Sequence, residues 1–303
     1  MLLASTHDYL LFFTDKGMAH WLKVYRIPSG GRHSMGKAIV NLLSLEGEKI
    51  AAWVRTREFS GKEFLVMLTK NGIVKRSSMA DYSRPRRGGI IAITLKESDA
   101  LIAAKRTDGG RELLVASRGG MAIRFKEEEV REIGRTGQGV RGIRLGEGDA
   151  AVGMAVDAGE TLMVVTENGY GKRTGISDYR LQSRAGSGVI NIKTHGRNGS
   201  VVGIVSVADS DQLLLVSSGG KMIRLFVKDV SVIGRNTGGV RLMKLDEGEK
   251  IVALEKISPD AADSEPGPSA QKEEPAAREK REERKEGPKP PKEEPPPEPI
   301  IIA

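Results

Sequence analysis

The chain has 303 residues, a net charge of +8 and no cysteine. The lack of cysteine excludes a disulfide-stapled secreted domain and any thiolate chemistry, and no apolar run approaches the roughly 20 residues that a membrane-spanning helix needs. No signal peptide opens the sequence, so we expect a cytoplasmic protein without a membrane partner.

The charge is unevenly distributed along the chain. Residues 258–303 contain 12 acidic and eight basic residues, a charge of −4, so residues 1–257 carry +12. Eleven of the 13 prolines also lie in 258–303. Such a segment has too little apolar surface to offset the entropy lost on ordering. The sequence therefore predicts a basic folded domain at 1–257 and a disordered tail at 258–303.

The N-terminal end predicts one isolated strand followed by a complete structural unit. Met1–Ala4 is a short apolar segment with no hairpin before it. We expect it to be an orphan strand, the last one of a unit that lies outside this sequence. The complete unit begins with the apolar segment 8–13 and continues through Trp21 and Tyr25 to the apolar segments 39–43 and 49–54.

This unit recurs five times, at approximately 5–54, 60–105, 110–155, 159–206 and 210–257. Its clearest copy has Asn168-Gly169 between two strand-like runs, which is a strong signal for a two-residue hairpin. The hairpin glycines of the five copies are Gly17, Gly72, Gly120, Gly169 and Gly220. An Arg-x-x-x-Gly motif begins at Arg32, Arg84, Arg135, Arg184 and Arg235. The position ten residues after the hairpin glycine, or eight in the first copy, is Tyr25, Tyr82, Val130, Tyr179 and Val230.

Each copy predicts four short β-strands: two in the hairpin, one after the Arg-x-x-x-Gly motif and one closing strand. The apolar residues run consecutively or alternate, so the helical period of 3.6 is absent. Four strands per unit at a period near 50 residues are typical of a propeller, because one small sheet buries its faces only by stacking on its neighbours. We therefore predict an all-β, propeller-like array of about five complete four-stranded blades plus the orphan N-terminal strand.

Residues suited to catalysis are scattered. The four histidines show no i, i+4 pairing for a metal, and neither a Gly-x-x-x-x-Gly-Lys-Ser/Thr loop nor a Gly-x-Ser-x-Gly elbow occurs. The acidic run at 127–129 is more simply a solvated connection. We expect no active site, no metal and no cofactor in this chain.

Basic residues, by contrast, recur in register with the repeats. The position four residues after the hairpin glycine is arginine in four of the five copies, and a lysine precedes two of these arginines. A single arginine of this kind could pair with a nearby acid or cap carbonyl groups. If every such arginine paired with a nearby acid, the repeats would have a net charge below the observed +12.

If each blade presents the same edge outward, these residues form a belt for the phosphates of duplex DNA, bound without regard to sequence. The aromatic content of 4% disfavours stacking on single-stranded bases. The candidate DNA-binding residues are Arg32, Lys75, Arg76, Arg84, Arg86, Arg87, Arg124, Arg135, Arg141, Lys172, Arg173, Arg184, Arg224, Arg235 and Arg241.

Several stretches closely resemble the C-terminal domain of DNA gyrase A. They are LKVYRIP at 22–28, IVNLL at 39–43, GVRGIRLGEGD at 139–149, NGYGKRT at 168–174 and GRNT at 234–237. The resemblance covers roughly residues 1–257. It implies a β-pinwheel, a propeller variant whose blades exchange strands, with DNA wrapped on its basic perimeter. It also implies membership of an ATP-dependent type II topoisomerase that introduces negative supercoils, with the remainder of gyrase A and with gyrase B as partners.

Two parts of that family would precede Met1. One is the breakage-reunion core with its nucleophilic tyrosine, and the other is the first blade with the basic box Gln-Arg-Arg-Gly-Gly-Lys-Gly, which the family needs for wrapping. The nearest echo here is PRRGGII at 85–91, in a later blade. Two alternatives remain open: the corresponding domain of topoisomerase IV, and a propeller that serves as a protein-interaction scaffold. Salt-dependent DNA binding would argue against the scaffold.

Overall fold

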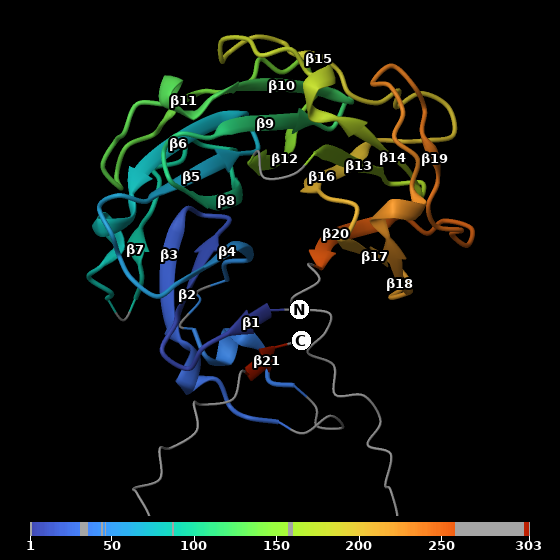
Figure 1. Cartoon of the computed structure of the whole chain (residues 1–303). Coiled ribbons are helices and arrows are strands. Elements are labelled where there is room, and N and C mark those ends of the chain that lie inside the picture. Colours follow the sequence, from blue (N-terminus) through green and yellow to red (C-terminus); the bar gives the residue numbers. More distant parts are fainter. Residues whose placement is uncertain are drawn as a thin grey trace, which may run out of the picture.

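A computed structural model describes residues 2–30, 36–43, 45, 47–86, 88–156, 160–257 and 300–302. Within these ranges the protein is all-β, and its small antiparallel sheets follow one another along an arc in the order of the sequence (Figure 1). No helix in the described part of the chain is long and apolar enough to cross a membrane. The predicted propeller-like array is confirmed.

Five sheets form the five blades. Blade 1 contains β4 (Ile50–Thr56), β2 (Tyr9–Thr14), β3 (Met18–Lys23) and β7 (Ile90–Ile91). Blade 2 contains β8 (Leu101–Thr107), β5 (Phe64–Thr69), β6 (Ile73–Ser78) and β11 (Val140–Arg141). Blade 3 contains β12 (Ala151–Val156), β9 (Glu112–Ser117), β10 (Met121–Lys126) and β15 (Val189–Ile190). Blade 4 contains β16 (Val201–Val207), β13 (Thr161–Thr166), β14 (Tyr170–Gly175) and β19 (Val240–Arg241). Blade 5 contains β20 (Ile251–Ile257), β17 (Gln212–Ser217) and β18 (Met222–Phe226).

The blades exchange strands. The last strand of each of the first four sheets comes from the next repeat along the chain: β7, β11, β15 and β19 pair with β3, β6, β10 and β14 of the preceding repeat. These four exchanged strands lie along the outside of the arc, whereas the closing strands β4, β8, β12, β16 and β20 lie toward its centre (Figure 1). We use "outer edge" for the four exchanged strands and the residues that directly follow them.

Two details differ from the predicted five complete blades and one orphan strand. Blade 5 has three strands among the described residues, in the order β18, β17 and β20. The N-terminal strand β1 (Leu2–Ala4) is not an orphan: it pairs antiparallel with β21 (Ile300–Ile302) from the end of the predicted tail. Residues 258–299 lie outside the described ranges.

Short 3₁₀ helices connect the strands in each repeat. They are η1 (Val24–Arg26), η2 (Ile39–Asn41), η3 (Met79–Tyr82), η4 (Glu127–Glu129), η5 (Ile176–Asp178) and η6 (Val227–Asp229). In the first copy, η2 occupies the segment where the sequence predicted a third strand. The first repeat therefore shows no exchanged strand within its described residues.

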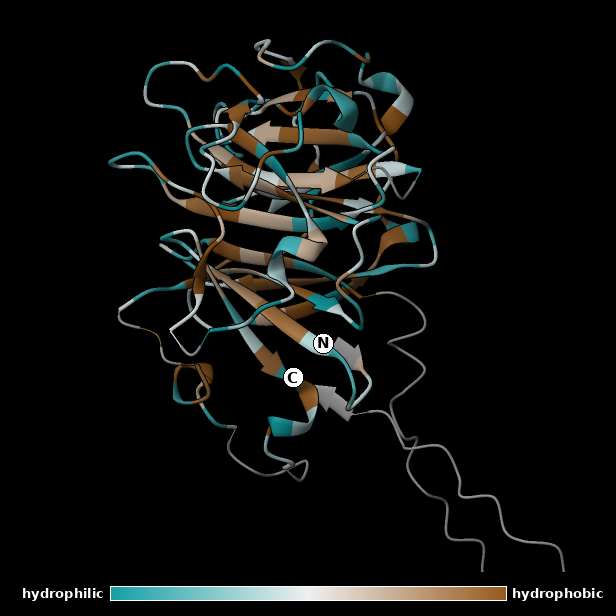
Figure 2. Cartoon of the chain, turned by 90° about the vertical axis from the view of Figure 1, so that its left-hand side faces the viewer, coloured by the Kyte–Doolittle hydropathy of each residue, from teal (hydrophilic) through white to brown (hydrophobic). Residues whose placement is uncertain are grey.

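The core is divided into layers between neighbouring blades. One layer joins Leu11 and Phe13 of blade 1 to Leu65, Met67 and Tyr82 of repeat 2, and three similar layers join the later pairs. In blades 1 to 4 both faces of the first hairpin strand are therefore buried, which explains why its apolar residues run consecutively, whereas buried and half-buried residues alternate along β17 of blade 5. Figure 2 shows the stacked strands mainly in the hydrophobic colours and the connecting loops mainly in the hydrophilic ones.

Four of the five hairpin turns are tightened by a buried hydroxyl acceptor three residues before the glycine. Thr14, Thr69, Ser117 and Ser217 accept hydrogen bonds through Oγ from the backbone N–H of the residue that follows the glycine, at 3.2–3.3 Å. The turn glycines have φ between 77° and 87°, but Asn168 does not have a positive φ, and the turn hydrogen bond runs from the Gly169 N–H to the Thr166 carbonyl. The hairpin is therefore a turn at Glu167-Asn168 followed by the glycine, and the predicted two-residue Asn-Gly turn is wrong in this detail.

Candidate nucleic-acid interface

The arginines four residues after the hairpin glycine connect neighbouring blades. Arg124 Nη1 donates to the Tyr179 carbonyl at 3.1 Å, and Arg173 Nε donates to the Val230 carbonyl at 2.6 Å. In the first copy, where the position is Trp21, the indole N–H donates to the Tyr82 carbonyl at 2.8 Å. Each acceptor lies ten residues after the hairpin glycine of the next repeat. The recurrence of this position thus follows from the contact between blades.

Ion pairs hold two of these arginines in place. Arg124 pairs with Glu112, and Arg173 pairs with Asp209. The Arg76 guanidinium lies 4.9 Å from the centre of the Phe64 ring. Arg224, on β18 of blade 5, is exposed and donates to Gln212 of its own hairpin.

The arginines of the Arg-x-x-x-Gly motif form a second set of inter-repeat contacts. Arg135, Arg184 and Arg235 donate through Nη1 to the carbonyls of Ile91, Arg141 and Ile190, at 3.1, 3.1 and 3.0 Å. Each acceptor is the second residue of the exchanged strand donated by the preceding repeat. These half-buried arginines therefore fix the backbone of the outer edge.

The glycine that ends the motif lies where the exchanged strand meets the blade that receives it. Gly139, Gly188 and Gly239 have φ of 89°, 78° and 73°, and a Cβ on each would meet a backbone carbonyl of the receiving hairpin. In the second copy the equivalent residue is Gly89 rather than Gly88, because Gly89 has φ of 78° and lies against the Ala19 carbonyl. One extra residue therefore separates Arg84 from its glycine.

Three of the predicted DNA-binding side chains are buried, which corrects that expectation for them. Lys75 Nζ donates to the carbonyls of Ala92 and Arg135, and Lys172 Nζ donates to those of Gly234 and Arg235 at 2.7 and 2.5 Å. The side chain of Arg173 is also buried. Their charges bind carbonyl groups between repeats, where phosphate has no access.

Burial makes the two lysines sensitive to pH. It lowers the pKa of Lys75 to about 7 and that of Lys172 to about 8, and in Lys172 the nearby Arg235 lowers the pKa further. Because the folded pKa is below the unfolded value of 10.5, the unfolded chain holds more protons between these values. Protonation therefore weakens the fold most below pH 7, and stability returns as the pH rises.

We expect the free energy of unfolding to rise above pH 8 by up to about 1.4 kcal/mol per pH unit for each lysine. Denaturant unfolding at about pH 7 to 9.5 tests this in the wild type and in the Lys75→Met/Lys172→Met variant, which lacks the two titrating groups. The difference between the two pH profiles should grow through this range. Parallel profiles would contradict it.

Other predicted residues are exposed along the outer edge. Arg141 and Arg241 are the second residues of β11 and β19, and both side chains are exposed. Arg241 Nη2 also donates to the Tyr170 hydroxyl at 2.8 Å. Arg84 and Arg86 are exposed on the loop that leads into β7, which is the position of the PRRGGII echo. Arg32 and Arg87 lie outside the described residues.

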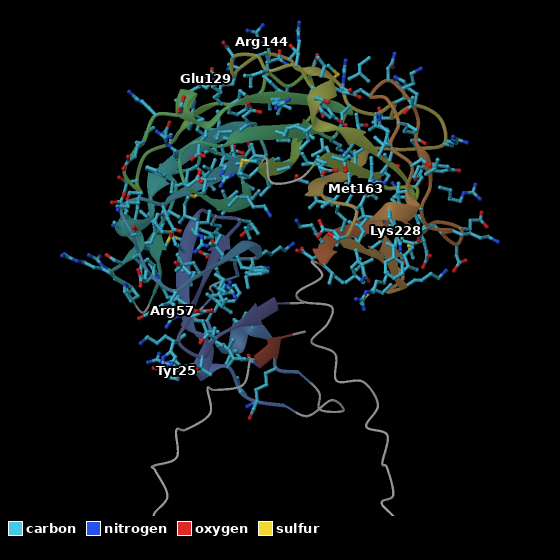
Figure 3. The ribbon with its side chains drawn as sticks, viewed as in Figure 1. Tyr25, Arg57, Glu129, Arg144, Met163 and Lys228 are labelled. Atoms are coloured by element: carbon cyan, nitrogen blue, oxygen red, sulfur yellow. The ribbon has the colours of Figure 1, made fainter. Side chains whose placement is uncertain are left out.

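The sequence interpretation missed a second basic position on the outer edge. Arg144, Lys193 and Lys244 each lie five residues after the motif glycine and are exposed. The backbone N–H of Arg144 donates to the Gly186 carbonyl, and that of Lys193 donates to the Thr237 carbonyl, so this position crosses to the next blade. Figure 3 shows Arg144 at the outermost part of the arc. In the sequence, these three basic residues each lie three positions after Arg141, Ile190 or Arg241.

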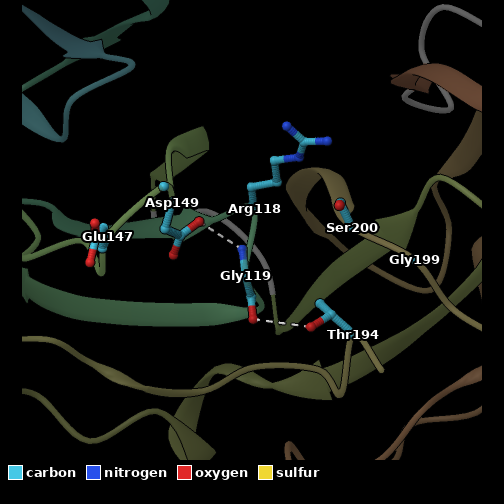
Figure 4. Close-up of a pocket in the computed structure, with 8 residues that line it drawn as sticks. Arg118, Gly119, Glu147, Asp149, Thr194, Gly199 and Ser200 are labelled. Carbon is cyan, nitrogen blue, oxygen red and sulfur yellow. Dashed lines mark hydrogen bonds between the residues drawn. The ribbon is translucent and has the colours of Figure 1, made fainter. Parts of the chain in front are cut away.

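A polar groove of about 460 Å³ between the hairpin turn of blade 3 and the loop at 194–200 offers a different kind of site (Figure 4). Its lining includes Glu147 and Asp149, and Asp149 Oδ1 accepts hydrogen bonds from the Gly119 and Ala150 N–H groups at 2.8 Å. Thr194 Oγ1 donates to the Gly119 carbonyl at 3.3 Å. These contacts hold the turn in place, and the two carboxylates of the groove outnumber its one cation, Arg118, which disfavours phosphate there. Among the described residues, no group of three or more histidine or acidic side chains is arranged to hold a metal.

Comparison with solved structures supports both the fold and its family. The chain resembles "Crystal structure of the C-terminal domain of DNA topoisomerase IV" with a TM-score of 0.76 and 26% identity, over 84% of this chain and 80% of the other. It resembles "Structure of DNA gyrase A C-terminal domain" with a TM-score of 0.74 and 28% identity, over 84% and 83%.

Comparison with curated sequences points to one protein of the gyrase complex. The chain is 43% identical to DNA gyrase A of Salmonella typhimurium over 88% of its length, and 48% identical to that of Helicobacter pylori over 80%. It spans about 30% of the length of these relatives. The family described as "DNA gyrase C-terminal domain, beta-propeller" matches residues 8–57, 63–108, 111–156, 160–208 and 211–258, one match for each repeat. The chain therefore belongs to the DNA gyrase C-terminal domain family.

Proposed function

We propose that the repeats bind duplex DNA along the outer edge and bend it, without regard to sequence. The observation that carries this proposal is the recurrence of exposed basic side chains at two fixed positions of that edge on successive blades. These side chains are Arg141, Arg144, Lys193, Arg241 and Lys244. These side chains would bind only the phosphates and not the base edges, because the outer edge offers no helix to a major groove.

The curvature of the outer edge implies that bound DNA bends. Smooth bending of a site of 20–30 base pairs costs about 1–6 kcal/mol. Counterion release on contact with several phosphates offsets a cost of this size at moderate salt. The exchanged strands present their backbones in fixed positions, so the charges along the bend are preorganised.

Within a whole protein, we propose that this domain acts as the C-terminal part of gyrase A. The named sequence relatives are all gyrase A, which favours gyrase over topoisomerase IV. Its partners would be the rest of gyrase A, gyrase B and the chromosomal DNA of the cytoplasm. The ATP-driven strand passage belongs to those other parts, and this domain would supply the wrapped DNA segment for negative supercoiling.

Affinity measured against salt concentration tests the proposal. The logarithm of the association constant should fall linearly with the logarithm of salt concentration, with a slope of about −0.9 for each phosphate neutralised. Fluorescence anisotropy with two duplexes of unrelated sequence provides the measurement, and the two slopes should agree. A protein-interaction scaffold would instead show a flat response and no saturable binding to either duplex.

A further inference from the structure

Besides Val240 on β19, four aliphatic side chains are exposed on or beside the outer edge, among its basic residues. Ile91 on β7 is 44% exposed and Ile190 on β15 is 41% exposed. Leu181 is 45% exposed and Val232 is 53% exposed, and both lie beside a hairpin strand of the preceding blade. Single exposed aliphatic residues are common on protein surfaces. These four occupy two equivalent positions of the repeat, each aliphatic in two repeats; the position of Leu181 and Val232 is Glu132 in repeat 3.

Inter-repeat contacts hold these residues in place. The carbonyls of Ile91 and Ile190 accept hydrogen bonds from Arg135 and Arg235. Leu181 and Val232 form parallel bridges with Arg124 and Arg173. Those two arginines are themselves fixed by ion pairs and carbonyl contacts. The aliphatic side chains therefore project from a rigid backbone.

The charges around these side chains favour DNA as the surface that covers them. The position of Ile91 and Ile190 is arginine in the other two exchanged strands, namely Arg141 and Arg241. Lys193 follows Ile190 by three residues, and Arg180 directly precedes Leu181, and both are exposed. Apolar side chains surrounded by cations match a ligand whose apolar surface is flanked by anionic groups. Duplex DNA has this chemistry in the deoxyribose walls of its minor groove.

Resting on the proposed DNA-binding function, we propose that Ile91, Leu181, Ile190 and Val232 press into the minor groove of the bound duplex and help to bend it. Apolar side chains in this position partly unstack base steps and bend DNA toward its major groove. Pyrimidine–purine steps deform most easily. Bound DNA should then bend most easily where TA steps are spaced at the helical repeat, although the domain reads no base directly.

The test replaces all four residues with serine and compares bending with binding. Bending is read from energy transfer between dyes at the two ends of a short duplex, and from the rate of ligase-catalysed circularisation. We expect the wild type to enhance the circularisation rate about ten times more than the variant does. The slope of DNA affinity against salt concentration should be the same for both. The dependence of bending on phased TA steps should also disappear.

Two further variants serve as controls. Val252→Ser removes an aliphatic residue that is 55% exposed on the closing strand β20, away from the outer edge, and should leave bending unchanged. Ile190→Val keeps an aliphatic group and should retain most of the bending. Full bending by the four-serine variant, or equal loss in Val252→Ser, overturns the inference while leaving the proposed function intact. No DNA binding by the wild type overturns the proposed function itself.

Discussion

Replacing Arg141, Arg144, Lys193, Arg241 and Lys244 together with glutamine is expected to lower the affinity for duplex DNA by about 10⁴-fold at about 0.1 M salt. All five side chains are exposed on the outer edge, at the two basic positions that recur from blade to blade. If each neutralises one phosphate, the salt slope should become less steep by about 4.5. Anisotropy titrations over a range of salt concentrations measure both quantities.

A second set of five substitutions provides a control with the same change of net charge. It consists of Arg55, Arg57, Lys62, Lys105 and Arg106, each replaced with glutamine. These exposed residues lie on or near the closing strands β4 and β8, at the opposite edge of the sheets from the exchanged strands. The control should lose far less affinity, because only the general field of the protein changes. Equal losses in the two sets would show that net charge alone, rather than the outer edge, determines binding.

The fold was predictable from the sequence because its signals are local and repeated. Gly169 and its counterparts mark the five hairpins, although the turn type differs from the predicted one, and the five copies of the pattern give the period. The exchange of strands between repeats was not derivable from such patterns. Val140–Arg141 and Val189–Ile190 are two-residue strands whose partners lie in the preceding repeat, and nothing local indicates which hairpin receives them.

The candidate site was predicted less well, for a physical reason. A residue type recurs at the same position of every repeat when the repeat requires it, either to bind a ligand or to pack against a neighbouring repeat. Arg124, Arg173 and Arg235 recur because each donates to a backbone carbonyl of a neighbouring repeat. Lys75 and Lys172 are buried at the same kind of contact. A ligand-binding residue can be told from a packing residue only by whether its side chain is exposed or buried. The exchanged strands determine which side chains are exposed.

Replacing Gly188 with alanine is expected to lower the free energy of unfolding by about 3 kcal/mol, the largest single-residue effect that we predict. Gly188 has φ of 78°, a conformation that costs a residue with a Cβ about 1–2 kcal/mol. The new Cβ would also overlap the Ala122 carbonyl oxygen, so the strand or the hairpin must move. The melting temperature should fall by about 10 °C for a domain of this size.

Gly146→Ala is the matched control, since that glycine has open space around its Cβ position and no positive φ. Its effect on stability should stay within about 0.5 kcal/mol. Similar losses in both variants would mean that backbone freedom in general, rather than the close approach of Gly188 to blade 3, sets the cost.

The site of the damage should also be local. Gly188 leads into β15, which pairs with β10 of blade 3 while its own hairpin belongs to blade 4. In an array where each blade contacts only its neighbours, loss of one exchanged strand weakens one interface and leaves distant ones unchanged. Hydrogen exchange should therefore accelerate in β10 and β15 and remain slow in β2 and β5. Because β15 also carries Ile190 and is followed by Lys193, the same variant should bend DNA less, which links the stability of the exchanged strand to the surface it presents.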